Sequence, residues 1–229
     1  MNYAPRTIAF VCELLHPPQI PDPGPIQRLH NEMFSSGDPA YRSFAVGQQG
    51  TVLSNPVTRP GAVSSAEFLT DRFRFREEFS SITVEEFGRR VLEISREVAR
   101  LRGIQIFTAQ VVTIRTLVNP RNFKDARSFL KEGMFGFEGE VEDFGRDPQL
   151  FGLRLVFPPA QDQPNAYTLR IESFANDPRS IFLENQGSFG PSVVARGLDS
   201  LEDCVQATYK FLVERALRFI GRFDARQTT

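Results

Sequence analysis

Reactive and metal-binding side chains are scarce in this sequence, which has two cysteines, two histidines and no tryptophan among 229 residues. Cys12 and Cys204 lie far apart within apolar segments, which is typical of small buried side chains and not of a disulfide framework. Two histidines without a repeated Cys or His spacing exclude the structural zinc patterns. We therefore expect no metal, no cofactor and no catalytic residue, and the residue types favour a protein that is not an enzyme.

One outline of a nucleophilic site is present. Cys12 and His16 fall on the same side of the first expected strand, with His30 on the helix that follows, and a thiolate beside an imidazole can act as a nucleophile. Residues two apart in a strand point the same way without meeting, and no oxyanion donor or orienting acid accompanies them. We interpret Cys12 as a core residue, His16 as a strand-end residue and His30 as a half-buried helix residue.

Long apolar runs and a dominant charge are also missing. No stretch approaches the roughly 18 uninterrupted apolar residues of a membrane helix, and no charged segment with an apolar run opens the chain. The 27 basic and 28 acidic residues nearly cancel, so no global field attracts the protein to nucleic acid or to an anionic membrane. These observations predict a cytoplasmic protein without a membrane partner. Lysine occurs only at positions 124, 131 and 210; this bias toward arginine indicates either GC-rich, bacterial coding or a preference for bidentate anion contacts.

The sequence signatures of phosphate loops are absent as well. The glycines of residues 187–190 precede no Lys-Ser or Lys-Thr step, and no GxGxxG spacing occurs. Glycine-rich residues 186–197 nevertheless predict a flexible loop before the last helix. Loops of that kind serve as lids or binding loops when they are not variable insertions.

Two long helices are the clearest elements that the sequence does contain, at 83–103 and 200–221. In both, a hydroxyl residue starts the helix (Thr83, Ser200) and an acid follows three positions later, which is the spacing of an N-terminal capping box. The first helix has an apolar stripe at steps of three and four, and Gly103 stands where a helix commonly ends.

The order of elements repeats along the chain. Before the first long helix we expect strands at 6–16, 41–54 and 67–79 and a short helix at 26–35; before the second we expect strands at 104–117, 150–157, 166–174 and 179–185 and a short helix at 122–131. The sequence thus predicts an α+β fold of two similar strand–helix–strand–strand–helix units, 1–103 and 104–229, related by a pseudo-twofold axis and packed as one body. Each unit is expected to have an antiparallel sheet covered on one face by its long helix. The order is similar to that of helix-grip or TATA-binding-protein-like halves, a likeness of architecture that does not fix function.

The most suggestive surface feature is a strand in which arginines alternate with phenylalanines. The pattern places Arg72, Arg74 and Arg76 on one side and Phe73 and Phe75 on the other, so that a basic row is displayed while the rings are buried. Further arginines that could extend the row are Arg115, Arg154 and Arg170.

Three interpretations of this row remain open. It can be a solvated sheet face whose arginines pair with neighbouring acids such as Glu67, Glu77 and Glu172, a surface that tracks a phosphate backbone, or a protein interface. Readers of single strands combine exposed aromatic rings with the charge on one face, whereas here the alternation separates them.

The function favoured by these features is that of a non-catalytic binding or scaffolding protein, which uses the arginine-bearing sheet face or a groove between the units. Its expected partner is another protein or a second copy of itself. One alternative is a nucleic-acid-binding protein that uses Arg72, Arg74 and Arg76. A second alternative is a small-molecule-binding protein or hydrolase with a pocket lined by some of the 22 phenylalanines.

Overall fold

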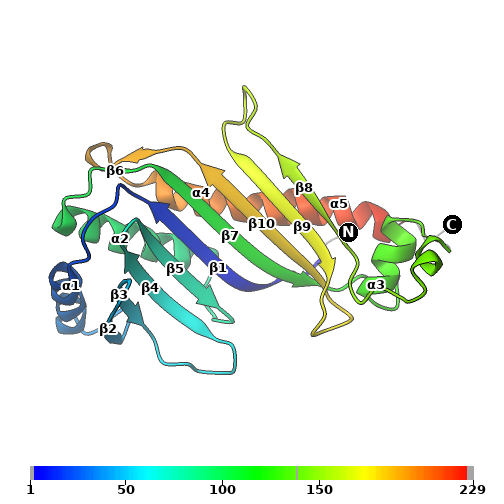
Figure 1. The fold of residues 1–229 in the computed structure, drawn as a ribbon, viewed down its shortest axis with the longest axis horizontal. Coiled ribbons are helices and arrows are strands. Elements are labelled where there is room, and N and C mark those ends of the chain that lie inside the picture. The colour runs from blue at the N-terminus through cyan, green and yellow to red at the C-terminus, as the bar shows by residue number, and fades with distance from the viewer. Residues whose placement is uncertain (1–2, 138, 226–229) are drawn as a thin grey trace.

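The computed structural model describes residues 3–137 and 139–225 and has an α+β fold built on one nine-stranded antiparallel sheet (Figure 1). The strand order is β2-β3-β4-β5-β1-β7-β10-β9-β8, and a small second sheet pairs β11 with β6. The strands are β1 (Arg6–Leu15), β2 (Ser43–Gly47), β3 (Gly50–Ser54), β4 (Val63–Leu69), β5 (Arg72–Glu78), β6 (Ile106–Phe107), β7 (Ala109–Val118), β8 (Gly152–Phe157), β9 (Ala166–Ser173), β10 (Ile181–Phe189) and β11 (Ser192–Val193).

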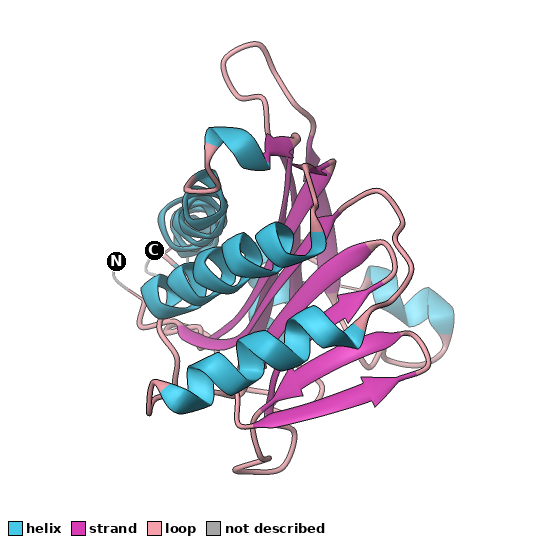
Figure 2. Ribbon diagram, turned by 90° about the vertical axis from the view of Figure 1, so that its left-hand side faces the viewer, coloured by secondary structure: helices cyan, strands magenta, loops and turns pink. Residues whose placement is uncertain are grey.

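The helices are α1 (Pro23–Ser35), α2 (Val84–Arg102), α3 (Ala126–Ser128), the π-helical η1 (Phe129–Met134), the short 3-10 turns η2 (Glu140–Phe144) and η3 (Val194–Arg196), and a C-terminal helix made of α4 (Ser200–Lys210), the π-helical η4 (Phe211–Ala216) and α5 (Leu217–Asp224). Figure 2 shows α1, α2 and the C-terminal helix on one side of the sheet, which we call the helix face. Figure 1 views the opposite side, the open face, and no helix in the described part of the chain covers its central strands.

The first strand that each half of the chain contributes to the nine-stranded sheet lies in the middle of that sheet. β1 and β7 are antiparallel neighbours, with Cys12 opposite Val112, and their outer neighbours are β5 and β10, the last strands of the same sheet before α2 and α4. The helix-face positions of β1 are apolar, because Phe10, Cys12 and Leu14 alternate toward the core.

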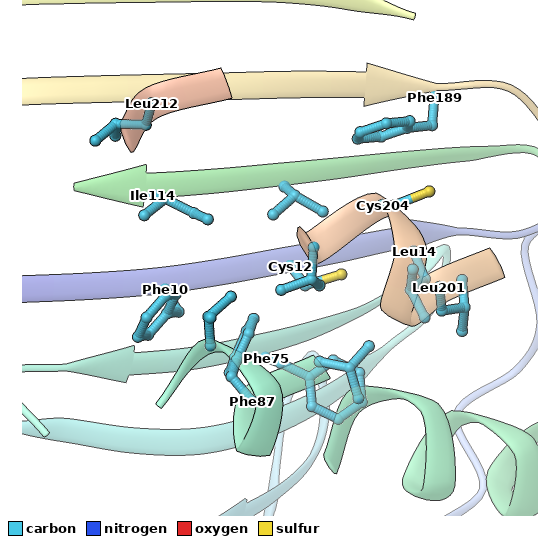
Figure 3. Packing of buried hydrophobic residues seen from close by; sticks show 14 of the residues in the cluster. Phe10, Cys12, Leu14, Phe75, Phe87, Ile114, Phe189, Leu201, Cys204 and Leu212 are labelled. Atoms are coloured by element: carbon cyan, nitrogen blue, oxygen red, sulfur yellow. The ribbon is translucent and has the colours of Figure 1, made fainter. Parts of the chain in front are cut away.

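Large apolar side chains from the helices and the sheet form one continuous core on the helix face. Phe10 of β1 stacks on Phe87 of α2 with ring centroids 5.3 Å apart. Figure 3 shows Cys12 and Cys204 in the same core, between the sheet and the two long helices. The helices α2 and α4 also touch each other, because Gly88 has no side chain and the chain of Glu202 occupies the space beside it.

The predicted ends of the first long helix are confirmed. The Thr83 hydroxyl accepts from the Glu86 N–H at 3.2 Å, and Gly103 ends α2 in the left-handed conformation with φ of 66°. The corresponding prediction for the second helix is wrong. Its N-cap is Asp199, with no side-chain capping bond, and the Ser200 hydroxyl lies 3.1 Å from the Ser192 hydroxyl instead.

Other differences from the predicted elements concern pairing. The two expected sheets are one, because β1 and β7 join the halves edge to edge. The predicted strands 41–54 and 67–79 fall within two hairpins, β2–β3 and β4–β5, and the expected helix 122–131 begins only at Ala126. The predicted loop 186–197 begins as strand, since β10 runs to Phe189 in the sheet beside β7 and β9.

Candidate functional site: the open face of the sheet

The six arginines singled out in the sequence all stand on the open face. In β5 the side chains of Arg72, Arg74 and Arg76 are between 31% and 35% exposed, whereas Phe73 and Phe75 between them are fully buried toward the helix face. The predicted alternation of β5 is therefore confirmed.

The remaining three arginines lie farther along the same face. Arg115 of β7 contacts Glu184 of β10 at 2.7 Å and Glu78 of β5 at 3.9 Å. Arg170 of β9 is directly opposite Arg154 of the edge strand β8, so both side chains are on one face. The sheet thus brings together residues that are up to 98 positions apart in the chain, from 72 to 170.

Acidic side chains separate these arginines and form one continuous row of ion pairs across the strands. Its contacts join, in order, Asp71, Arg72, Glu13, Arg74, Glu67, Arg76, Glu78, Arg115, Glu184, Arg170 and Glu172. We call this set the charge row. It holds five arginines and six carboxylates, so its formal net charge is −1.

The pairing predicted for Glu67 and Glu172 is present in the charge row, but that for Glu77 is wrong. Glu77 follows the period of Phe73 and Phe75 and points to the helix face, where it binds Arg90. Four further acids, Asp71, Glu13, Glu78 and Glu184, complete the row. Their signal in the sequence is the two-residue alternation of β1, β5 and β10, which can be used only once the neighbouring strands are known.

The charge row fixes the positions of its side chains but adds little to the free energy of folding. Its side chains are partly exposed, and a single exposed ion pair is worth only about 0–1 kcal/mol. Each inner member contacts two partners, so the long arginine and glutamate chains are held in place over the sheet. A surface of fixed, alternating charges is therefore presented to whatever approaches it.

An apolar hollow of about 390 Å³ interrupts the charged surface between β1, β9 and β10. Its floor includes Ile8 and Phe182, which with Leu117 form a small buried cluster separate from the main core, and Phe174 stacks on Phe182. The full lining is Ile8, Ala9, Glu78, Phe79, Arg115, Leu150, Arg170, Glu172, Ser173, Phe174, Ala175, Phe182 and Glu184. We call it the face hollow; it includes three phenylalanines, the residue type expected of the predicted Phe-lined pocket.

Phe79 at the rim of the face hollow has an unusual backbone. Its φ is +48°, a conformation that costs a non-glycine residue about 1–3 kcal/mol. The Phe79 N–H donates to the Ile8 carbonyl at 2.7 Å, and the Arg59 guanidinium donates to the Phe79 carbonyl. Contacts on both sides therefore hold the strained residue.

The cysteines and His16 are parts of the core. Burial raises the pKa of the Cys12 thiol, and it raises the pKa of Cys204 to about 12, so both are protonated near neutral pH. Burial lowers the pKa of His16, whose ring packs edge-on against Phe73 while Nδ1 lies 2.8 Å from the Pro17 carbonyl oxygen. None of the three lines the face hollow.

No model of a known protein family matches this chain, and a search of curated proteins finds no match. Among the helices of residues 3–137 and 139–225, none has the length and apolar character needed to cross a bilayer.

Proposed function

We propose that this is a non-catalytic cytoplasmic binding protein whose open sheet face holds a segment of another protein. The observation that carries the proposal is the combination of an ordered, nearly neutral charge row with an apolar hollow in the same uncovered face. A sheet face that only meets water needs polar side chains, but it has no need of a hollow floored by Ile8 and Phe182.

The charges of the open face favour a polypeptide over a nucleic acid. A phosphate backbone binds through cations that replace its counterions, whereas every arginine of the charge row already contacts at least one carboxylate. The aromatic rings of β5 are buried under the sheet, so they cannot stack on bases. A protein segment with side chains of both signs meets such a row without excess charge.

The expected partner segment has an apolar side chain flanked by acidic and basic residues. Its apolar side chain enters the face hollow, where Arg115 and Glu184 stand at the wall, and its charged side chains join the ends of existing ion pairs. Interfaces of this type have a desolvated anchor surrounded by polar contacts, and the anchor supplies most of the binding free energy.

We also infer that the sheet arose from two equivalent units, residues 1–103 and 104–229. In support, β1 and β7 occupy matching central places, β5 and β10 flank them, and a long helix on the helix face follows each flanking strand. This arrangement agrees with the pseudo-twofold, TATA-binding-protein-like order expected from the sequence, and it makes one continuous face available to a partner.

The proposal is tested with a photo-crosslinking amino acid at Leu150, which lines the face hollow and is 44% exposed, in cells that express the full chain. The matched control carries the same group at Phe34, a residue of similar exposure (47%) in α1. We expect Leu150 alone to crosslink a distinct protein. Binding of that protein, once purified, should weaken at least tenfold in Leu150→Asp and remain unchanged in Phe34→Asp.

Three outcomes contradict the proposal. Equal crosslinking from both positions means that the contact is nonspecific. A crosslink to a second copy of this chain assigns the face to self-association. Retention of single- or double-stranded oligonucleotides that falls steeply with salt and is lost in Arg74→Glu assigns it to nucleic acid.

A further inference from the structure

A second, larger hollow lies beside the C-terminal end of β5, where the chain leaves the sheet and enters α2. It has a volume of about 850 Å³, and we call it the α2 cleft. One wall is a face of α2 that carries Glu86, Arg89, Arg90 and Glu93, and the others are the end of the β4–β5 hairpin and the loops around residues 38–42 and 55–62. Polar and charged side chains dominate its lining.

A buried carboxylate stands in the wall of the α2 cleft. Glu77 is 2% exposed, and its Oε1 accepts from the Ser64 hydroxyl at 2.8 Å and from Arg90 Nη1 at 2.6 Å. Burial raises the pKa of Glu77 above its ordinary value. The Asn55 amide donates to the Ser64 hydroxyl at 2.9 Å, so the group that holds the carboxylate is itself fixed.

Arg90, the partner of Glu77 in this ion pair, is also fixed by further contacts. Its second nitrogen contacts Glu86 at 3.0 Å, and its guanidinium lies 5.4 Å from the centroid of the Tyr41 ring, which is fully buried. A buried ion pair is weak evidence for stability, because desolvation offsets most of its attraction. A buried pair in the wall of an open cleft is typical of a site whose polar groups are arranged for a ligand.

Three more arginines line the α2 cleft, and they make fewer contacts with other side chains than Arg90 does. Arg42 and Arg89 are exposed and make no ion pair within the described residues, whereas Arg59 donates to the Phe79 carbonyl through Nε and Nη2. Asp38 and Glu93 also line the cleft without an ion pair in that part of the chain. The cleft therefore offers free cationic groups together with carboxylates that can accept hydrogen bonds.

We propose that the α2 cleft binds a small hydroxylated organic anion, whose carboxylate or phosphate lies against Arg42 and Arg89 and whose hydroxyl donates to Glu77. Arginine is suited to this role, because its planar fork binds an oxyanion through two parallel hydrogen bonds. Glu77 is suited to the second role, because Arg90 and Ser64 both bind Oε1, and a ligand hydroxyl adds a donor to the same carboxylate. The site is separate from the face hollow, with which it shares only Glu78 and Phe79 among its lining residues.

The test uses two matched pairs of probes on the full chain, with calorimetry at constant ionic strength. L-malate and succinate, the test carboxylates, differ by one hydroxyl group. Glycerol 3-phosphate and propyl phosphate are the corresponding phosphate pair, with the same three carbons and with or without the hydroxyl groups. We expect the hydroxylated member of one pair to bind at least about tenfold more tightly than its partner, because a hydrogen bond to a charged group is lost without it. The pair that shows this difference identifies the class of anion.

Variants assign the binding to the α2 cleft. Arg42→Gln and Arg89→Gln should each weaken the hydroxylated probe about tenfold or more, while Arg100→Gln, an exposed arginine of the same helix that pairs with Glu97 outside the cleft, should leave it unchanged. Glu77→Gln should reduce the difference within the pair without changing the affinity of the simpler anion. Since Arg42 and Arg89 are exposed, their variants fold even if Glu77→Gln does not.

Three results overturn the proposal. Absence of binding by all four probes at 20 mM, on the order of the weakest affinities worth measuring, removes the site. Equal binding by wild type, Arg42→Gln and Arg89→Gln places any bound anion elsewhere. Equal affinity within both probe pairs excludes the contact between a ligand hydroxyl and Glu77.

Discussion

Gly187 tests the packing of the C-terminal helix on the sheet. It lies in β10, within the stretch that the sequence presented as a flexible loop. A Cβ at this position would lie 2.5 Å from Thr208 Oγ1 and 2.8 Å from the ring of Phe189, both closer than real Cβ contacts. We therefore expect Gly187→Ala to destabilise the fold, because α4 or Phe189 must move to admit one methyl group.

The size of the effect follows from this geometry. Overpacking in a well-packed core costs about 1–3 kcal/mol, and for a chain of this size about 1 kcal/mol lowers the melting temperature by roughly 2–4 °C. Gly187→Ala should therefore melt about 2–12 °C below wild type in a circular dichroism or calorimetric scan. Gly190→Ala is the matched control: its Cβ would meet nothing within 4 Å, and its melting temperature should equal that of wild type or exceed it slightly.

A double-mutant cycle identifies the contact. The Thr208 hydroxyl donates to the Cys204 carbonyl at 2.8 Å, so Thr208→Ala alone has its own cost. In the Thr208→Ala background the added methyl group no longer meets Oγ1, and Gly187→Ala should cost at least about 0.5 kcal/mol less there, with the remainder due to Phe189. If Gly187→Ala matches Gly190→Ala, or if the two changes are additive, then α4 does not lie over Gly187 as described.

Three other predictions test local contacts. Thr83→Ala should lower the free energy of unfolding by about 1 kcal/mol because it removes an observed N-cap, whereas Ser200→Ala removes no cap and should cost clearly less in the same urea titration. Asp224→Asn should cost about 1–3 kcal/mol in thermal melts, because the buried carboxylate accepts from the Tyr3 hydroxyl and from two main-chain N–H groups, and a cost below that of Ser200→Ala would contradict this assignment. The raised pKa of Glu77 means that the folded state holds the Glu77 proton to higher pH than the unfolded state does. The stability gained from this proton is therefore full below pH 4.5 and is lost as pH rises through the folded pKa. Urea melts of Glu77→Gln should lack that decline, and a wild-type pH dependence in the variant would refute the prediction.

The parts of the fold that depend on local chemistry could be predicted from the sequence. The α2 helix has its N-cap at Thr83 and its C-cap at Gly103 as expected, because a cap and a left-handed glycine act within one turn. The two faces of β5 follow from its alternation alone. Both are decided by residues that are neighbours in the chain.

The second capping box failed although its letters match the first. A cap needs extended backbone at the hydroxyl residue, and Ser200 is already helical because Asp199 precedes it in a helical conformation. The Ser200 hydroxyl turns instead toward Ser192, which β11 brings close. The backbone conformation that decides between these partners is set by the preceding loop and not by the spacing of the letters.

Residues 186–197 are a second case in which the sequence alone could not predict the structure, here because the outcome depends on packing. The glycines there predict flexibility, yet Gly187 lies in a buried strand where only the absence of a side chain lets α4 approach. Glycine in a strand has two physical uses, freedom of the backbone and close approach by a neighbour. Only the position of the neighbouring helix, which begins 13 residues later at position 200, distinguishes them.

The charge row explains why the arginines of β5, taken alone, give an incomplete picture of the charge on the open face. Arg72, Arg74 and Arg76 are adjacent in the sequence and look like a basic surface, but Glu13 comes from β1 and Glu67 from β4, on either side of β5. In an antiparallel sheet the charge that a ligand meets is the sum over neighbouring strands, and the order of strands is not written in any one of them. A row that sums to −1 lacks the excess of cations that a polyanion needs, while it still offers both signs locally. Under the proposed function, such a surface would select its partner by the pattern of charges and by the apolar side chain that fits beside them.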